Sequence, residues 1–110
     1  LAREGYPLDM GALLDSCARN GTMVELNADP HRLDLDWRHL RDAAGRGVMV
    51  SINPDAHSIR GLNNVDYGVM IARKGWLEPG NIFNTRSCDE VAVWLGLSSG
   101  KRRKYLFPDK

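Results

Sequence analysis

Two short apolar runs along the chain predict β-strands, Thr22–Asn27 and Val48–Asn53. The second run is apolar nearly throughout, which is typical of a strand that is covered on both faces. After the first run, Ala28-Asp29-Pro30 ends regular structure, because proline lacks an amide hydrogen and restricts the residue before it. The pattern therefore predicts two separate strands, each followed by a polar segment.

Apolar residues at helical spacing predict four helices around these strands. The first starts after Asp9 and stops at Asn20-Gly21; the second starts at Asp34 or Asp36 and stops near Gly45. The third spans residues 61–74, and a capping box at residues 87–90 opens the fourth. The apolar faces predicted for the four helices are, in order, Met10, Leu13, Leu14 and Cys17; Trp37, Leu40 and Ala44; Leu62, Val65, Val69 and Ala72; and Val91, Trp94 and Leu95.

The predicted order is helix, strand, helix, strand, helix, helix. Strands that are joined through a helix run parallel, with a right-handed crossover, so the pattern predicts an α/β fold. A parallel sheet of two strands is too small to cover both faces and close its edges. We therefore interpret the chain as part of a larger α/β sheet or barrel, or as a chain that associates to complete one.

Composition narrows the class of protein. The chain has 110 residues, 43% hydrophobic and 26% charged, which fits one small globular domain. No apolar run approaches the roughly 18 residues that a membrane span needs, and the first residues do not resemble a signal peptide. Cys17 and Cys88 both fall on predicted apolar stripes, so we expect buried thiols and a reducing, cytoplasmic setting.

The net charge of +1 hides an asymmetry between the end of the chain and the rest. The last ten residues, KRRKYLFPDK, hold five basic residues and one acid, for +4, which leaves −3 for the remainder. Such a tail can meet nucleic-acid phosphates, or it can be a solubilising or linker segment. We interpret residues 98–110 as a basic C-terminal tail and 1–97 as the folded part.

Polar side chains cluster where each predicted strand ends. Since parallel strands end at the same edge of a sheet, the two clusters are expected to lie close together, where α/β folds place their ligand sites. The first cluster holds Glu25, Asn27, Asp29, His31, Arg32 and Asp34, and the second holds Asn53, Asp55, His57 and Ser58.

Asp55 and His57 are two residues apart, so an extended backbone would send both side chains to the same side. A carboxylate and an imidazole that converge on one point suit zinc or manganese. The alternative is a turn with an Asp-His hydrogen bond. A metal also needs further ligands, for which His31 and Glu25 are the candidates in this chain.

Arg32 and Asn27 are candidates for contact with a substrate. An arginine at the rim of a strand end suits phosphate recognition, and its alternative partner is an ion pair with Asp34 or Asp36. Asn27 can donate to a substrate oxygen or satisfy turn backbone. The three tryptophans are expected in the core or between helices; they are Trp37, Trp76 and Trp94.

Three segments together resemble the C-terminal part of the PHP (polymerase and histidinol phosphatase) domain. They are VELNADPHRLDLDW, INPDAHSIRGLNNVDYGVMIARKGWL and NIFNTRS. The resemblance runs over about residues 4–97 and is closest to the PHP domain of bacterial family X DNA polymerases. It implies the C-terminal portion of a distorted, seven-stranded β/α barrel, with two or three parallel strands and four helices in this chain.

The resemblance also implies a function. PHP domains hold up to three divalent metals and hydrolyse phosphoesters, and the polymerase-linked ones resemble manganese-dependent 3′–5′ exonucleases acting on DNA ends. Asp55 and His57 match the family's last Asp-x-His metal pair, and Arg32 and Asn27 would lie near the bound phosphate. The partners it implies are DNA 3′ ends, the rest of the barrel and an upstream polymerase domain, with no membrane.

The family's HxH motif and its further His and Glu ligands are missing from the 110 residues. The chain alone is therefore expected to have little nuclease activity, with an incomplete manganese or zinc site, and to self-associate through exposed sheet edges. Two other functions stay open. One is a non-catalytic module that binds nucleic acid or protein, and the other is a small-molecule phosphatase of the histidinol phosphate type.

Overall fold

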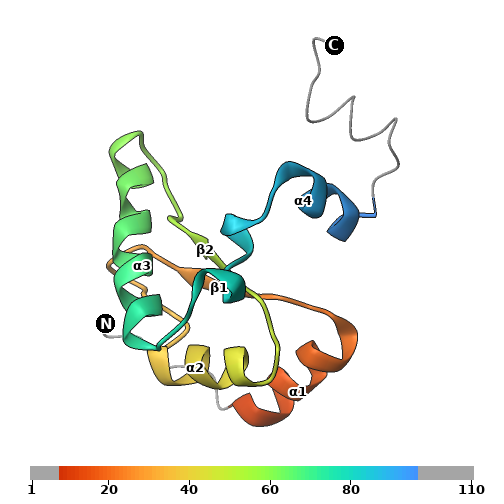
Figure 1. The fold of residues 1–110 in the computed structure, drawn as a ribbon. Coiled ribbons are helices and arrows are strands. Elements are labelled where there is room, and N and C mark those ends of the chain that lie inside the picture. Colours follow the sequence, from red (N-terminus) through yellow and green to blue (C-terminus); the bar gives the residue numbers. More distant parts are fainter. Residues whose placement is uncertain (1–7, 97–110) are drawn as a thin grey trace.

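The computed structural model describes residues 8–96, and its elements follow the predicted order (Figure 1). Each strand begins two residues later than predicted, and the first part of the third predicted helix is a 3-10 turn, Arg60–Asn64. The basic tail lies outside the described residues. The main elements are α1 (Met10–Asn20), β1 (Val24–Asn27), α2 (Trp37–Gly45), β2 (Val50–Asn53), α3 (Val65–Lys74) and α4 (Cys88–Trp94).

Helix ends lie where capping residues predict them. Asp9 Oδ1 accepts a hydrogen bond from the Ala12 amide (3.0 Å), and Gly21 ends α1 in the left-handed conformation at φ 66°. Ser87 caps α4 by accepting from the Glu90 amide at 3.2 Å. Of the two acids proposed for α2, Asp36 is the cap. These ends are set locally, because a capping side chain satisfies amides only two or three residues away.

The sheet consists of β1 and β2, which run parallel with Val24 opposite Val50 and Asn27 opposite Asn53. An isolated parallel bridge joins Val50 to Ile82, where a third strand was possible. The Asn84 side chain accepts from the Ile52 amide (2.8 Å) and donates to the Ile52 carbonyl (2.9 Å), so it occupies the outer edge of β2. An α/β fold with a small parallel sheet is confirmed, and the barrel stays a prediction.

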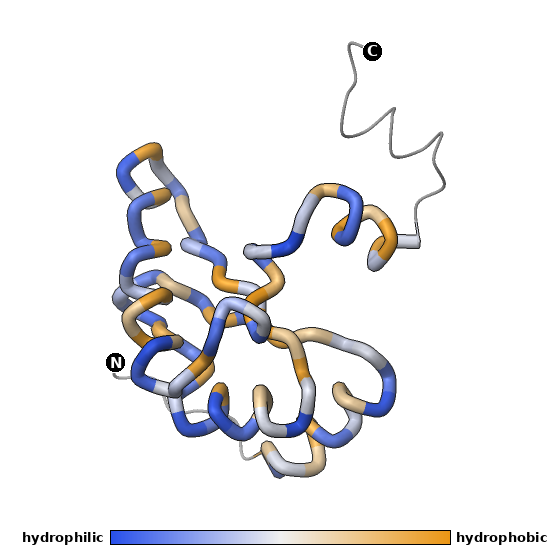
Figure 2. The backbone as a smooth tube through the Cα atoms, in the orientation of Figure 1, coloured by the Kyte–Doolittle hydropathy of each residue, from blue (hydrophilic) through white to orange (hydrophobic). Residues whose placement is uncertain are grey.

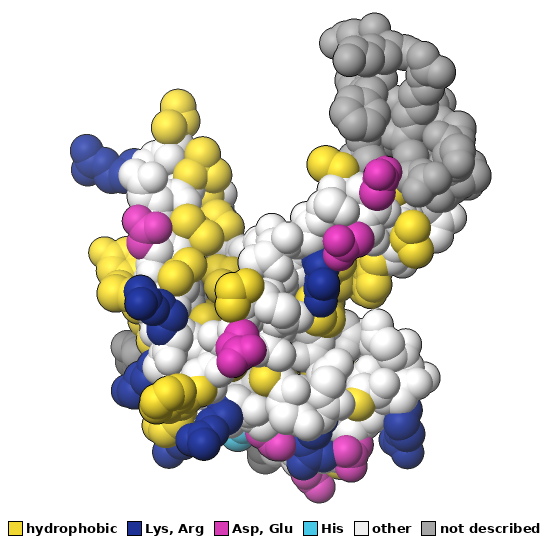
Figure 3. Space-filling model, in the orientation of Figure 1, with side chains coloured by type: hydrophobic (Ala, Val, Ile, Leu, Met, Phe, Trp, Pro, Cys, Tyr) yellow, Lys and Arg dark blue, Asp and Glu magenta, His cyan; other side chains and the backbone are white. Residues whose placement is uncertain are grey.

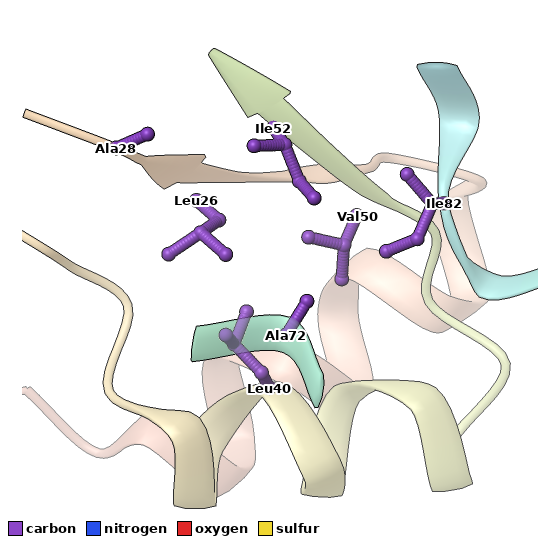
Figure 4. Close-up of a cluster of buried hydrophobic side chains, with 7 residues drawn as sticks. All are labelled: Leu26, Ala28, Leu40, Val50, Ile52, Ala72 and Ile82. Carbon is purple, nitrogen blue, oxygen red and sulfur yellow. The ribbon is translucent and has the colours of Figure 1, made fainter. Parts of the chain in front are cut away.

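The core lies between one face of this sheet and the helices α2 and α3 (Figure 4). Leu26 and Val50 point from the strands toward Leu40 of α2 and Ala72 of α3. Gly68 lets α3 come this close, because a Cβ there would lie 2.5 Å from Ile52 Cγ2. A second cluster packs α1 against α2; it consists of Leu14, Cys17, Ala43 and Val48.

The prediction that β2 is covered on both faces is wrong. Along Val50–Asn53, buried and half-buried residues alternate. Glu25 of β1, which lies on the same face of the sheet as Asn53, is exposed. Successive side chains of a strand leave on opposite sides, so the second face of the sheet carries Glu25, Asn27, Ser51 and Asn53. One face is apolar and helix-covered, and the other is polar.

Several residues that helical spacing placed on inward faces are exposed instead, among them Leu62 (57%), Trp94 (50%) and Leu95 (54%). Figure 2 shows hydrophobic and hydrophilic residues alternating along α3 and α4. The residues that α3 and α4 bury are small, Gly68, Ala72 and Ala92. At Gly68 the reason is close contact, since an added Cβ would lie 2.5 Å from Ile52 Cγ2. Leu13, Val69 and Cys88 are also exposed.

The tryptophans differ from one another. Trp37 is half-buried as expected, whereas Trp76 is 79% exposed, so its prediction as a core residue is wrong. Cys17 is buried as predicted. Among residues 8–96, no helix is long and apolar enough to cross a membrane.

Candidate metal centre at the strand ends

The structure brings the two polar clusters together at the carboxyl ends of β1 and β2. Because the strands are parallel and in register, Asn27 and Asn53 lie side by side. The Asn27 Nδ2 group donates to Asp55 Oδ2 at 3.2 Å, and Asn53 Nδ2 donates to Glu25 Oε1 at 2.8 Å. Both hydrogen bonds join residues that are 28 positions apart in the sequence.

The backbone at Asp55 is not extended, as the argument from two-residue spacing assumed. Asp55 has φ 52°, in the left-handed region that aspartate tolerates better than most residues. Its carboxylate is half-buried and turned toward Asn27. The pairing of Asp55 with His57 therefore follows from a turn after Pro54, and not from the alternation of a strand.

The His57 ring is fixed by its own loop. Its Nδ1 atom lies 2.8 Å from the backbone carbonyl oxygen of Asp55. A carbonyl oxygen only accepts, so Nδ1 carries the hydrogen and the lone pair of the neutral ring is on Nε2. Metal-binding histidines are oriented in this way, with one ring nitrogen donating to a carbonyl and the other free for the metal. The alternative interpretation was a turn with an Asp-His hydrogen bond. That hydrogen bond is present, but His57 makes it to the backbone carbonyl of Asp55 and not to the Asp55 carboxylate.

Asp29 and His31 form a second pair on the loop after β1. Asp29 Oδ1 accepts from the His31 amide (2.8 Å) and contacts the ring Nδ1 (3.1 Å). The hydrogen bond from the His31 amide lowers the pKa of Asp29 below its ordinary value. The hydrogen bond from the His31 ring and the charges of His31 and His57 also lower this pKa, whereas burial raises it.

Asp55 and His57 fit two positions of a metal site and not a whole one. A carboxylate oxygen and an imidazole nitrogen are ligands that manganese and zinc accept. In the part of the chain that the structure describes, no three His, Cys, Asp or Glu side chains are grouped to hold a metal. The further candidates bond elsewhere, Glu25 with Asn53 and His31 with Asp29.

Asn27 and Arg32 differ in burial and in the groups that they contact. Asn27 is buried, and while its Nδ2 group binds Asp55, its Oδ1 atom accepts from the Asp29 amide at 3.0 Å. It thus ties the loops after β1 and β2 to each other. Arg32 is exposed, and its Nε atom lies 3.8 Å from Asp34 Oδ1, the ion pair foreseen as the alternative.

One polar link was missed from the sequence. Ser51 Oγ donates to Asn53 Oδ1 at 3.1 Å, and Asn53 in turn donates to Glu25, which makes a row of polar groups across the sheet. The signal for it was present, because these residues occupy alternate positions of the two predicted strands.

A pocket of about 190 Å³ lies at the opposite end of the strands. It is lined by residues that precede β1 and β2, including Met23 and Met49, and by Trp94 of α4. It shares no lining residue with the polar strand ends, so it does not form part of the candidate metal centre.

The chain is similar in sequence to a known protein. No family model matches the chain. Over 93 residues it is 44% identical to the protein named DNA polymerase/3'-5' exonuclease PolX from Bacillus subtilis (strain 168). The chain is therefore related to PolX. The alignment covers 84% of this chain and 16% of PolX, so the chain spans a small part of that relative's length.

Proposed function

We propose that this chain is part of a metal-dependent phosphoesterase, the 3′–5′ exonuclease PHP domain of a family X DNA polymerase. The observation that carries the proposal is the loop after β2, where the His57 Nδ1 atom is bound to the Asp55 carbonyl, while its Nε2 atom makes no hydrogen bond within residues 8–96. The relationship to PolX, whose name includes a 3'-5' exonuclease, supports the choice of DNA as the substrate.

In this proposal, different residues of the chain bind one cation and the DNA end. Asp55 and His57 hold the cation, and Asn27 keeps the Asp55 carboxylate turned toward it through the 3.2 Å hydrogen bond. Arg32, once released from Asp34, adds positive charge beside the phosphate. A bound manganese or zinc ion would lower the pKa of a water molecule and neutralise charge on the phosphoryl oxygens.

The remaining ligands, the other barrel strands and a polymerase domain would come from the longer protein. We therefore expect the 110 residues alone to bind metal weakly, to cleave little DNA, and to self-associate through the edge of β1, since Asn84 and Ile82 occupy the edge of β2. The proposal implies a cytoplasmic location, where the DNA is.

A chimera tests the proposal. The matching segment of B. subtilis PolX is replaced by this chain, and 3′–5′ cleavage of a labelled DNA strand is measured with manganese and with a chelator. We expect cleavage that requires the metal and falls at least about 100-fold in Asp55→Asn and His57→Gln, because each change removes a metal ligand. The 110-residue chain alone serves as the inactive reference.

The matched controls are Asp66→Asn and His39→Gln, which change the same residue types outside the strand-end loops. They should keep full exonuclease activity, and all variants should keep polymerase activity. Undiminished cleavage by Asp55→Asn and His57→Gln would refute the proposed role of the pair.

A further inference from the structure

The turn that follows α3 places a tryptophan where a glycine is usual. The Trp76 amide donates to the Arg73 carbonyl (3.0 Å) and the Leu77 amide to the Ala72 carbonyl (3.1 Å). These two bonds form a Schellman motif, whose left-handed residue is most often glycine because it lacks a Cβ. Trp76 fills that position at φ 61°, a conformation that is unfavourable for a bulky side chain.

Packing does not explain the residue either. The Trp76 side chain is 79% exposed, while the next residue, Leu77, packs against the core. Backbone geometry favours a smaller residue here, and burial contributes little. Backbone strain at an exposed aromatic residue is a reason to look for a ligand of that residue.

Two basic residues, Arg73 and Lys74, precede Trp76 in the sequence, and basic side chains also lie over the nearby start of α2. Lys74 Nζ lies 5.5 Å from the centre of a Trp37 ring, and Arg38 Cζ lies 5.8 Å from a Trp37 ring centre. Gly75 packs against the start of α2, since a Cβ there would lie 2.9 Å from the Trp37 carbonyl oxygen. Trp76 therefore follows directly after the point where α3 meets α2 (Figure 1).

The cations at this junction are largely not neutralised. Within the described residues 8–96, Arg73 and Lys74 take part in no ion pair, while Arg38 is paired with Asp36 at 2.9 Å. The other acid close in sequence is Glu78. Figure 3 shows Lys and Arg side chains beside hydrophobic ones around the lower end of α3. The junction thus combines an exposed ring with positive charge.

We propose that this junction is a contact site for single-stranded DNA, with an unpaired base stacked on Trp76 and phosphates bound by Arg73 and Lys74. Aromatic rings next to basic side chains are the usual means of holding a single strand, because every base has a face that can stack. A base-paired duplex does not offer such a face at its side. The choice of DNA rests on the proposed function, and the contact residues do not include Asp55 or His57.

The test measures binding of a fluorescent oligothymidylate of about twelve nucleotides to the longer protein, with a chelator present so that no cleavage occurs. Trp76→Gly should weaken binding about 10-fold, the size of effect that one lost base stack gives. Trp76→Tyr should retain most of the affinity. Arg73→Gln with Lys74→Gln should lower the slope of log affinity against log salt by about 1.4, or 0.7 for each lost phosphate contact.

Two controls separate binding from folding. Trp76→Gly should unfold at the same or a higher temperature than the parent, because glycine suits the left-handed position better. Ile59→Ala, which changes another highly exposed apolar residue, should leave DNA affinity unchanged.

Three results would overturn the inference. They are unchanged DNA affinity in Trp76→Gly, no single-strand binding by the parent protein, and Trp76 fluorescence in the longer protein that is shielded from quenchers before DNA is added. Failure of the metal proposal would look different, because cleavage would survive Asp55→Asn while DNA binding still depended on Trp76.

Discussion

The two faces of the β1–β2 sheet differ although the same two strands build both. On one face Leu26, Val50 and Ile52 are buried under α2 and α3. On the other, Asn53 bonds to Glu25 and to Ser51, and Asn27 reaches Asp55. The alternation of side chains along a strand allows this division, since neighbouring residues point to opposite sides.

The apolar face of the sheet contributes mainly to the stability of the fold, and the polar face contributes to the candidate metal centre. The apolar face is covered by helices of this chain, so a change there removes buried contacts and weakens the fold. The polar residues bond mainly to one another and to the loops at the strand ends, and among them Asn27 holds Asp55, so a change at Asn27 acts on the candidate metal centre as well. Substitutions on the two faces should therefore have different readouts.

The largest effect is expected on the apolar face, from Leu26→Ala. Leu26 is fully buried among residues of both strands and both helices, so truncation should lower the free energy of unfolding by about 2–5 kcal/mol. Urea denaturation measures this. Leu62→Ala, a change of the same type at a 57% exposed position, should stay within about 0.5 kcal/mol. Equal losses from the two would contradict the division.

On the polar face, Asn27→Ala should act on both properties. It removes the donor to Asp55 Oδ2 and the acceptor of the Asp29 amide at a site that is 7% exposed, so we expect a loss of about 1–3 kcal/mol in stability. Manganese affinity of the chimera should fall about 10–100-fold, because Asp55 is no longer held in place.

The matched control is Asn53→Ala, whose lost hydrogen bonds go to Glu25 and Ser51 and not to Asp55. Its manganese affinity, measured by the same titration, should remain near that of the parent. If both variants bound manganese equally well, Asn27 would have no role in positioning Asp55.

The smallest effect is expected away from both faces, at the start of α2. Hydrogen bonds from the Arg38 side chain, and then from its amide, lower the pKa of Asp36 to about 2 from an ordinary 3.8. The ionised form is thus favoured by folding, so its stabilisation is present above about pH 4 and lost as the pH falls toward 2. Because Asp36 is partly exposed and solvent-screened, the change is modest.

Asp36→Asn should flatten the dependence of the unfolding temperature on pH between about 4 and 2. Asp89→Asn, at an exposed position in the first turn of α4, should leave that dependence nearly unchanged. An unaltered acid transition in Asp36→Asn would show that the Arg38 contacts do not stabilise the ionised carboxylate.

Most of the element order could be predicted from the sequence, because the signals are local. Asp9 and Ser87 accept hydrogen bonds from amides three residues ahead, and Gly21 supplies the left-handed end of α1. The position of Asp55 and His57 at a strand end also followed from the chain order alone. Their spacing did not predict their geometry, because the extended backbone it assumed is absent at Asp55.

The sequence by itself determined the helices, the two parallel strands and the loops that carry polar residues. Only the tertiary structure decided which apolar stripes are buried, since close approach of α3 selects Gly68 and Ala72 and leaves Leu62 outside. It also decided that Asn27 meets Asp55 across 28 residues, and that Trp76 is exposed. These outcomes depend on contacts between distant segments, which local spacing does not encode.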